Sequence, residues 1–460
     1  REHYGIAPVE DLKLQDYNTL DKIAGFVVTH SGSPTVATAA PSTKESSSSN
    51  SGSDAGSVVD RYVPGWIYGG NAAEKASDFK NAVVVGGAWL QAVVGAENAP
   101  LKMDAAPEAL AKGTTLVLDL NEIAQNPVEA VMTVRSWLLS GPERVLLVES
   151  GIQSTRPWAA HAHTAAAAAF AMSYGRENDP ERSIIHIQLA EAKLTGKKAS
   201  QLPSAISLRD LCVSGKGIGA VRIAKDGTRR VRSLVHSTLS LSDEQKAAVP
   251  QSVLALGGTR GITARMMESL VDDGAKHITL VGRTGPGSDI DGDRSLLAMP
   301  QQERRTLIMS QLKEAGDRPT PALVERVESK AQARVEVADT IASLESKGAK
   351  VELVLGDASE MKVIKSAIKK ATKGGRIDLI VHAAGVDVSR MLDRKSVDEI
   401  ELVLNVKIQP AMHLLEALED VDFGAFTTFS SVAAHFGNAG QTDYAAANAA
   451  LEALTDAVGN

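Results

Sequence analysis

The sequence has a single cysteine, Cys212, among its 460 residues. One cysteine excludes an intramolecular disulfide and a cysteine-based metal site, and it is typical of proteins that work in a reducing compartment. We therefore expect the protein to be cytoplasmic.

Long apolar runs are also missing. The longest, around Ala165 to Met172, is rich in alanine and much shorter than the roughly 18 apolar residues that a membrane helix requires. The chain begins at Arg1 with neither a methionine nor a charged segment followed by an apolar one, so no signal peptide is visible. We expect a chain that does not span a membrane and that is a piece of a longer protein.

Neither sign of charge dominates the chain. Its 49 Lys and Arg and its 56 Asp and Glu residues give a formal net charge of −7, and the two signs are interspersed. Without a basic stripe, nucleic acids and anionic membranes are poor candidates for partners. A hydrophobic content of 43% over this length is sufficient for two or three packed domains, as in an ordinary soluble enzyme.

The stretch from Pro41 to Ser57 is rich in serine and glycine and has almost nothing apolar to bury. This composition predicts a flexible linker, which we place at residues 30–57. The preceding residues 1–29 include Tyr17 to Val28, whose apolar side chains recur at helical spacing and predict one amphipathic helix.

Two further regions, 58–245 and 246–460, alternate strand-like runs with helical stretches. Such alternation predicts an α/β fold with a parallel, doubly wound sheet in each region. We expect strands at residues 82–85, 115–120, 145–149 and 184–189 in the first region, and at 252–256, 277–281, 350–355, 377–381 and 425–429 in the second.

The first region has no usable phosphate-binding turn. After its first strand, Gly86-Gly87 continues into Trp89 rather than into a second, spaced glycine. Near its end, Asp226-Gly227 separates two alternating runs, which is a strong hairpin signal. We therefore expect a nucleotide-type fold that binds no nucleotide.

The second region has a glycine turn directly between a strand and a helix. Glycines at this point let a pyrophosphate approach the backbone and the positive end of the helix. Open α/β sheets bind their ligands at the carboxyl ends of the strands, where the third and fourth strands of this region also end. The expected cofactor-binding residues are Gly257, Gly258, Thr259, Arg260, Gly261, Ile262, Gly282, Arg283, Asp357, Ala358, His382, Ala383, Ala384 and Gly385.

Arg283 follows the second strand of this region. An acidic residue there would bind a ribose 2′-hydroxyl, whereas an arginine offers positive charge to a 2′-phosphate. Arg260, inside the glycine turn, provides a second cation. We therefore expect NADPH as the cofactor, although each arginine taken alone could be an ordinary surface residue.

Four polar side chains converge on the same edge of the predicted sheet. Ser431 follows the fifth strand, and Lys407 lies on the long helix before that strand. Tyr444 and Asn448 are four residues apart, so they share a face of the next helix. Each residue alone has an ordinary structural explanation, but the four together predict the reduction of a ketone.

The chemistry of that reaction suggests a role for each residue. Hydride addition builds an alkoxide that must be protonated, yet an unperturbed tyrosine has a pKa of about 10. A neighbouring ammonium favours the phenolate and lowers such a pKa, so we expect Lys407 to tune Tyr444 as the general acid. Ser431 would hold the carbonyl oxygen, and Asn448 would hold a water that relays protons.

The spacing of these residues resembles that of ketoreductases of type I polyketide synthases, which belong to the short-chain dehydrogenase/reductase type. Lys407 precedes Ser431 by 24 residues, Tyr444 follows it by 13, and Asn448 stands where single-domain members have lysine. The runs GGTRGIT and SSVAAHFGNAGQTDYAAAN are most similar to the ketoreductases of polyunsaturated fatty acid synthases. The resemblance covers residues 58–460.

A second resemblance concerns Tyr4 to Val27, which are similar to the second half of an acyl carrier protein. The Asp-Ser-Leu motif that would bear phosphopantetheine is absent from this segment. The resemblance therefore implies the C-terminal part of a carrier domain at residues 1–29.

Together these resemblances imply two Rossmann-like doubly wound subdomains, a structural one at 58–245 and a catalytic, NADPH-binding one at 246–460. They imply reduction of a 3-oxoacyl thioester, held on the phosphopantetheine of an acyl carrier protein, within a homodimeric megasynthase. Thr263, Asp387-Val388-Ser389 and Phe436 depart from the pattern of many family members and leave the configuration of the product hydroxyl open.

Two alternatives remain, a free-standing dehydrogenase of a diffusible alcohol and a catalytically silent domain. Residues 285–349 form a much longer connection than usual, and we expect helical padding or a docking surface there rather than a catalytic role. His161 and His163 suggest a zinc site but lack a third ligand nearby, so we expect no metal.

Only five strands are predicted in the second region, whereas a doubly wound dinucleotide fold has at least six. We expect the last strands and the lid over the substrate to be missing. The strand at 425–429 would then be an apolar edge, and a chain that ends at Asn460 would be poorly soluble and essentially inactive.

Overall fold

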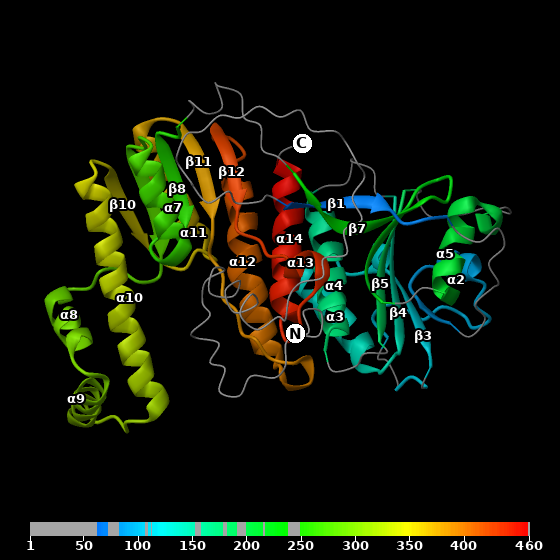
Figure 1. Ribbon diagram of the computed structural model, residues 1–460, viewed down its shortest axis with the longest axis horizontal. Helices are drawn as coiled ribbons and strands as arrows, with labels where there is room; N and C mark the ends of the chain where they lie inside the picture. The colour runs from blue at the N-terminus through cyan, green and yellow to red at the C-terminus, as the bar shows by residue number, and fades with distance from the viewer. Residues whose placement is uncertain are drawn as a thin grey trace, which may run out of the picture. The chain divides into compact units, whose positions relative to one another are not determined.

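Two β-sheets, each covered by helices, make up the part of the chain that the structure describes (Figure 1). The structure is a computed structural model, and it describes residues 62–71, 82–105, 109–111, 113–151, 158–177, 182–190, 199–214, 217–237 and 249–458. The carrier-like segment and the linker that we predicted at 1–29 and 30–57 lie outside these residues. Both sheets belong to one unit, Asp60–Asn460.

The first sheet has seven strands in the order β1-β7-β6-β5-β4-β3-β2. Strands β2 to β6 are parallel, as predicted, and β6 and β7 form the antiparallel hairpin predicted around Asp226-Gly227. The sheet comprises β1 (Tyr62–Tyr68), β2 (Val83–Val85), β3 (Thr115–Asp119), β4 (Arg144–Ser150), β5 (Ser183–Leu189), β6 (Ile218–Ile223) and β7 (Arg229–His236), with helices α2 (Ala88–Val94), α3 (Pro127–Leu139), α4 (Trp158–Gly175) and α5 (Pro203–Ser214).

Strand β1 was not predicted from the sequence. It pairs antiparallel with β7 at the edge of the sheet, and it contains Pro64 and Gly65. Proline cannot donate a ladder hydrogen bond, so it is confined to edge strands, and a short run that contains it is not recognised as a strand.

The second sheet has five parallel strands in the order β10-β9-β8-β11-β12. The first strand in the chain, β8, is central, and the strand order reverses between β8 and β11, as the doubly wound prediction requires. All five residues of β8 are buried because helices cover both faces. The strands are β8 (Ser252–Leu256), β9 (His277–Gly282), β10 (Lys350–Leu355), β11 (Ile377–His382) and β12 (Phe423–Thr428).

Helices cover this second sheet on its two faces. Side chains of α7 and α10 pack on one face, and those of α11 and α12 pack on the other. The helices are α7 (Gly261–Asp272), α8 (Ile290–Ala298), α9 (Gln301–Glu314), α10 (Pro321–Ser346), α11 (Met361–Ala371), α12 (Val397–Ala417), α13 (Ala433–Phe436) and α14 (Thr442–Val458).

Strand β12 is one edge of the second sheet and begins two residues earlier than predicted. Among the described residues, only β11 pairs with it. Helix α14 contacts this strand, and the hydroxyls of Thr428 and Thr455 lie 3.0 Å apart. The expected edge strand is therefore present, and α14 covers part of it.

A shared core joins the two halves of the described chain, the first built around β1 to β7 and the second around β8 to β12. Alanines of α4, including Ala166 and Ala167, and alanines of α14, including Ala446 and Ala450, are fully buried in one cluster. Small side chains let the two helices pack closely, side by side in Figure 1. The alanine-rich run that was too short for a membrane helix thus forms the seam between the halves.

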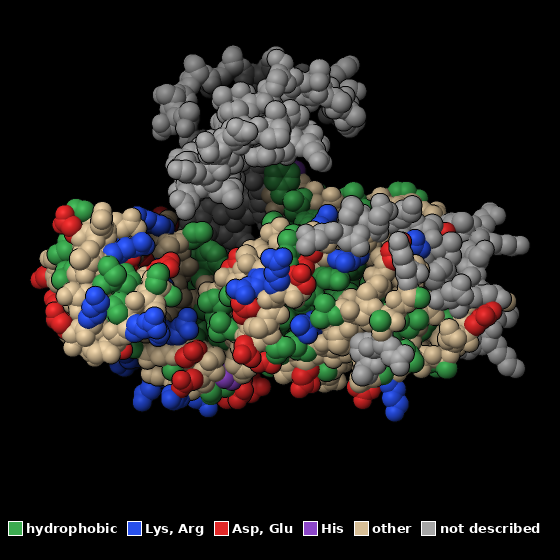
Figure 2. Space-filling view, turned by 90° about the horizontal axis from the view of Figure 1, so that it is seen from below, with side chains coloured by type: hydrophobic (Ala, Val, Ile, Leu, Met, Phe, Trp, Pro, Cys, Tyr) green, Lys and Arg blue, Asp and Glu red, His purple; other side chains and the backbone are tan. Residues whose placement is uncertain are grey.

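On the face shown in Figure 2, Lys and Arg side chains are interspersed with Asp and Glu side chains. Several of these charges pair in the connection between β9 and β10. Arg304 and Arg305 both contact Glu328, and Arg334 contacts Asp293 at 2.5 Å. The long connection is therefore a folded group of three helices, α8 to α10.

Candidate active site

A cleft of about 410 Å³ lies at the carboxyl ends of β8, β9, β10 and β11. Its lining includes eleven of the fourteen residues that we predicted to bind cofactor, which are Gly257, Thr259, Arg260, Gly261, Gly282, Arg283, Asp357, Ala358, Ala383, Ala384 and Gly385. A volume of this size is within the range of small-molecule and cofactor sites. The cleft is therefore the best candidate for a cofactor site in the described part of the chain.

The glycine turn after β8 packs closely against the loop that follows β11, and it leaves the start of α7 uncapped. Gly257 has a φ of +79°, and a Cβ at this position would lie 2.9 Å from the backbone nitrogen of Ala384. Arg260 is the N-cap residue of α7 and makes no side-chain capping bond. The first amides of α7 are therefore available to an anion, as a dinucleotide turn requires.

Three predicted cofactor residues do not line the cleft. Gly258 packs behind the turn, where a Cβ would meet Ala255 and Leu280, and Ile262 is 76% exposed. His382 is fully buried, and its Nε2 lies 2.7 Å from the carbonyl oxygen of Lys407. Burial lowers the pKa of His382 to about 4, so its ring is neutral and supports α12 from beneath.

Charged side chains from the turns after β8, β9 and β10, and from α10, line one part of the cleft. The pKa of Asp357 is lowered, mainly by a hydrogen bond from the backbone of Ser359 and in smaller part by the charge of Arg283. The Arg283 side chain is exposed. Arg260 forms an ion pair of 3.7 Å with Glu336 of α10. Glu336 was missed from the sequence, because nothing local marks one acidic residue of a 26-residue helix as part of a distant cleft.

Lys407 of α12 is the buried cation of the site. It is 3% exposed, and burial lowers the pKa of its ammonium to about 8. Its Nζ donates to the carbonyl oxygen of Phe429 at 2.9 Å and lies 6.0 Å from the centre of the Tyr444 ring. A Cβ on Gly385 would lie 2.9 Å from Cε of Lys407, so this lysine packs directly against a residue that lines the cleft.

Tyr444 and Asn448 lie one turn apart on α14, as predicted. Asn448 is fully buried, and its Nδ2 donates to the carbonyl oxygen of Tyr444 at 2.7 Å. Its Oδ1 is a buried acceptor without a hydrogen-bond partner among the described residues. Such an atom calls for a polar partner, and a bound water would satisfy it.

Ser431 completes the group after β12. Its hydroxyl is half-buried and accepts a hydrogen bond of 3.2 Å from the backbone of Ala433. This bond leaves the hydroxyl hydrogen free to be donated. The fold thus brings the segment after β12, the middle of α12 and the first turn of α14 together around Lys407.

In the corresponding turn of the first sheet, a side chain of the protein bonds the backbone amide, beside a hollow of about 430 Å³ that Gly86 and Gly87 line. The Oδ2 atom of Asp119 accepts hydrogen bonds from Nε1 of Trp89 at 2.6 Å and from the backbone of Gly87 at 3.3 Å. The Asp119 carboxylate therefore accepts the hydrogen bond that the Gly87 amide would otherwise donate to a phosphate. This geometry gives a physical reason for the prediction that the first half binds no nucleotide.

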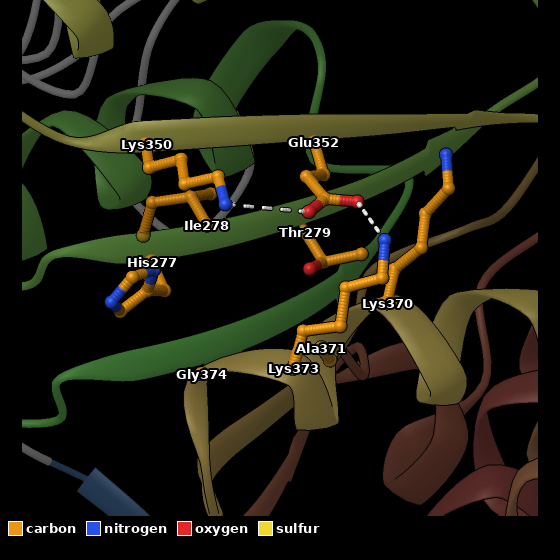
Figure 3. A pocket seen from close by; sticks show the side chains of 9 residues that line it. All are labelled: His277, Ile278, Thr279, Lys350, Glu352, Lys370, Ala371, Lys373 and Gly374. Carbon is orange, nitrogen blue, oxygen red and sulfur yellow. Dashed lines mark ion pairs between the residues drawn. The ribbon is translucent and has the colours of Figure 1, made fainter.

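A second hollow, in the same half of the chain, lies near the start of β9 and β10 (Figure 3). Glu352 points between Lys350 and Lys373 and pairs with them at 3.9 and 3.8 Å. The hollow measures about 40 Å³, which is room for little more than a water molecule. It is too small for a cofactor.

Neither a metal site nor a membrane span is found in the described part of the chain. No group of three or more His, Cys, Asp or Glu side chains there could hold a metal ion, and the side chain of His161 lies outside that part. None of the helices in the described ranges is long and apolar enough to cross a membrane.

The half of the chain that contains β8 to β12 is similar to known sequences. Residues 251–458 match the KR domain family. A polyunsaturated fatty acid synthase chain of Thraustochytrium sp. (strain ATCC 26185 / S-3) is 30% identical over 209 residues, which are 43% of this chain and 7% of that protein. Polyketide synthase GfsA of Streptomyces halstedii is 29% identical over 225 residues, which are 49% of this chain and 2% of that protein. The chain thus spans less than a tenth of the length of these relatives.

Solved structures show the same fold across both halves. PlmKR1, the ketoreductase from the first module of phoslactomycin biosynthesis in Streptomyces sp. HK803, superposes with a TM-score of 0.59 at 20% identity and covers 85% of this chain and 77% of its own. An A1-type ketoreductase superposes with a TM-score of 0.63 at 20% identity, over 87% of this chain and 80% of its own. The chain therefore has the fold of these solved ketoreductases, and its residues 251–458 match the KR domain family.

Proposed function

We propose that the chain uses NADPH to reduce a 3-oxoacyl thioester, carried by an acyl carrier protein, to the 3-hydroxyacyl thioester within a megasynthase. The observation that supports this most strongly is the position of the buried Lys407 ammonium, beside the Tyr444 ring and at the end of a glycine-lined cleft. The relatives are many times longer than this chain, which favours neighbouring catalytic and carrier domains.

The cleft suits a phosphorylated dinucleotide. The turn at Gly257 and the open amides of α7 would hold the pyrophosphate, and Arg283 would contact the 2′-phosphate. Bound NADPH would supply the hydride. The residues of the chain then have to orient the ketone and deliver a proton.

Each polar residue has a distinct task in this proposal. Ser431 donates its free hydrogen to the carbonyl oxygen, where negative charge develops, and Tyr444 donates the proton to that oxygen. The ammonium of Lys407 stabilises the phenolate that remains, and with a pKa of about 8 it is largely protonated at neutral pH. The unpartnered Oδ1 of Asn448 would accept a hydrogen bond from a water that resupplies the proton.

The assay that tests this function measures NADPH oxidation by the intact enzyme that contains this chain, with a 3-oxoacyl thioester of N-acetylcysteamine as the substrate. The proposal requires oxidation that depends on the thioester. Turnover of free ketones alone would support a free-standing dehydrogenase, and cofactor binding without turnover would support a silent domain.

We expect Arg283→Ala to weaken NADPH binding by about 10- to 100-fold, the usual effect of removing a hydrogen bond to a charged group. NADH should be affected much less, because it has no 2′-phosphate. Dissociation constants for both cofactors, measured by fluorescence, test this. Arg265→Ala on α7 is the matched control, since that side chain is 82% exposed and pairs with Glu268. An equal loss for NADH would show that Arg283 does not read the phosphate.

We expect Glu336→Gln to strengthen NADPH binding by about two- to fivefold, the size of one partly exposed charge pair. The carboxylate now faces a cleft for an anionic ligand and pairs with Arg260, so its removal frees that guanidinium. Asp339→Asn is the control, because Asp339 lies on the same helix and pairs instead with Arg294. Weaker binding after Glu336→Gln would mean that the carboxylate holds Arg260 in its binding position.

A further inference from the structure

The loop that leads into the catalytic helix rests on the structural half. It connects α13 to α14, and residues at the end of α4 and just after it contact this loop and the last residue of α13. Nε of Arg176 donates to the carbonyl oxygen of Phe436 at 3.1 Å. Ser173 donates to the carbonyl oxygen of Asn438 at 2.5 Å and accepts from its amide at 3.2 Å. Residues more than 250 positions apart thus determine where this loop lies.

Glu177, two residues after α4, reaches further into the catalytic half. It is 4% exposed. Its Oε1 accepts a hydrogen bond from the amide of Gly440 at 3.2 Å, and its Oε2 accepts one from the amide of Leu392 at 2.9 Å. One carboxylate therefore links two loops of the catalytic half, and both bonds cross the seam between the halves.

Gly440 connects Glu177 to the start of α14. Its carbonyl oxygen accepts from Nζ of Lys395 at 3.2 Å, and the same Nζ donates to Oδ1 of Asp443 at 2.5 Å. That oxygen also accepts from the amide of Tyr444 at 2.9 Å. The side chains of Lys395 and Asp443 are fully buried, so a continuous buried chain of polar contacts runs from Glu177 to Tyr444.

Such a chain is costly to bury. Burial raises the pKa values of both Glu177 and Asp443, which means that desolvation outweighs the partners that stabilise their charges. Apolar residues of similar volume often stabilise a fold at least as well as a buried ion pair. Its value here is geometric, because the rate of a proton transfer is sensitive to small displacements of the donor.

We propose that Glu177 is a positioning residue for the catalytic tyrosine. By holding Gly440 against Lys395, it sets the first turn of α14 and with it the place of the Tyr444 phenol. The structural half then contributes to the rate of reduction and not only to stability. This inference rests on the proposed ketoreduction and on no property of the cofactor site.

The first test measures kcat, NADPH affinity and thermal unfolding of Glu177→Gln and Glu177→Ala. We expect kcat to fall by about 10- to 100-fold in the alanine variant, as for a small displacement of a reacting group. The kcat of the glutamine variant should lie between those of the wild type and the alanine variant, because its amide group has one acceptor oxygen where the carboxylate has two. NADPH affinity should stay nearly unchanged in both.

Glu149→Gln is the matched control. Glu149 is a buried carboxylate of the same half, and it contacts the hydroxyl of Thr164 and the ring of His186. Its replacement should leave kcat close to that of the wild type. A drop in kcat equal to that of Glu177→Gln would show a general effect of disturbing the structural half, and it would overturn the proposal.

A double-mutant cycle with Tyr444→Phe separates positioning from packing. If Glu177 acts through the phenol, Glu177→Gln should have little further effect on the residual rate once the phenol hydroxyl is gone. If Glu177→Gln lowered kcat by the same factor in the wild type and in Tyr444→Phe, the proposal would be overturned. A Glu177→Gln protein with lower stability but wild-type kcat would overturn it as well. Failure of the proposed function would look different, since the wild type itself would then reduce no thioester.

Discussion

Replacing Tyr444 with phenylalanine should lower the rate of ketoreduction by about 10²- to 10⁴-fold, which is the usual contribution of a positioned general acid. The ring remains to fill its place beside Lys407, whereas the proton donor is lost. Because Tyr444 does not line the dinucleotide cleft, NADPH affinity should hardly change. Steady-state rates with a thioester substrate and a separate titration of NADPH binding measure the two effects.

Tyr174→Phe provides the control for this experiment. Tyr174 lies in the structural half, where its ring packs against the guanidinium of Arg182 at 4.0 Å. This variant should keep nearly full activity. Turnover close to wild type in Tyr444→Phe would contradict the mechanism proposed above.

Lys407→Ala should reduce kcat/KM by about 10²-fold or more, since the phenolate loses its stabilising cation. The wild-type enzyme should also become less active as the pH rises through about 8, where the buried ammonium loses its proton. Lys407 stabilises the phenolate only while it is protonated and positively charged. Activity should therefore be highest below this pH and fall above it. A profile of kcat/KM for the wild type and for Lys407→Ala, measured from about pH 6 to about pH 10, tests the loss of rate and the decline near pH 8.

Lys370→Ala is a matched control for this lysine. Its Nζ also donates to a backbone carbonyl, that of Leu353, at 3.0 Å, but it lies outside the cofactor cleft. The control should keep both its rate and the decline near pH 8. If the decline persisted unchanged in Lys407→Ala, another group would be responsible for it.

Local patterns predicted most of the strands and the position of the glycine turn after β8 well. The apolar run of β8 coincides with the observed strand, because a strand covered on both faces must be apolar along its length. The half-exposed edge strand β12 was placed two residues late, since its ends are not marked by burial. Tyr444 and Asn448 could be paired because helical spacing alone puts them on one face.

Long-range polar contacts could not be predicted in this way. Glu177 contacts a residue 215 positions away, and no periodicity relates the two. Glu336 lies on a helix whose exposed face carries many other charges, so its place in the cleft follows only from how α10 crosses the sheet. Both contacts depend on the packing of whole elements, which a single sequence does not display.

The carboxylate of Asp119 has a consequence for how many cofactor molecules one chain can hold. Two similar sheets would suggest two dinucleotides per chain, as after a duplication in which both copies keep their ligand. In the first sheet, however, Asp119 already bonds the amide of Gly87 and the ring nitrogen of Trp89, and its negative charge would repel a phosphate. The binding stoichiometry of NADPH should therefore be one per chain, which a titration of NADPH binding would measure.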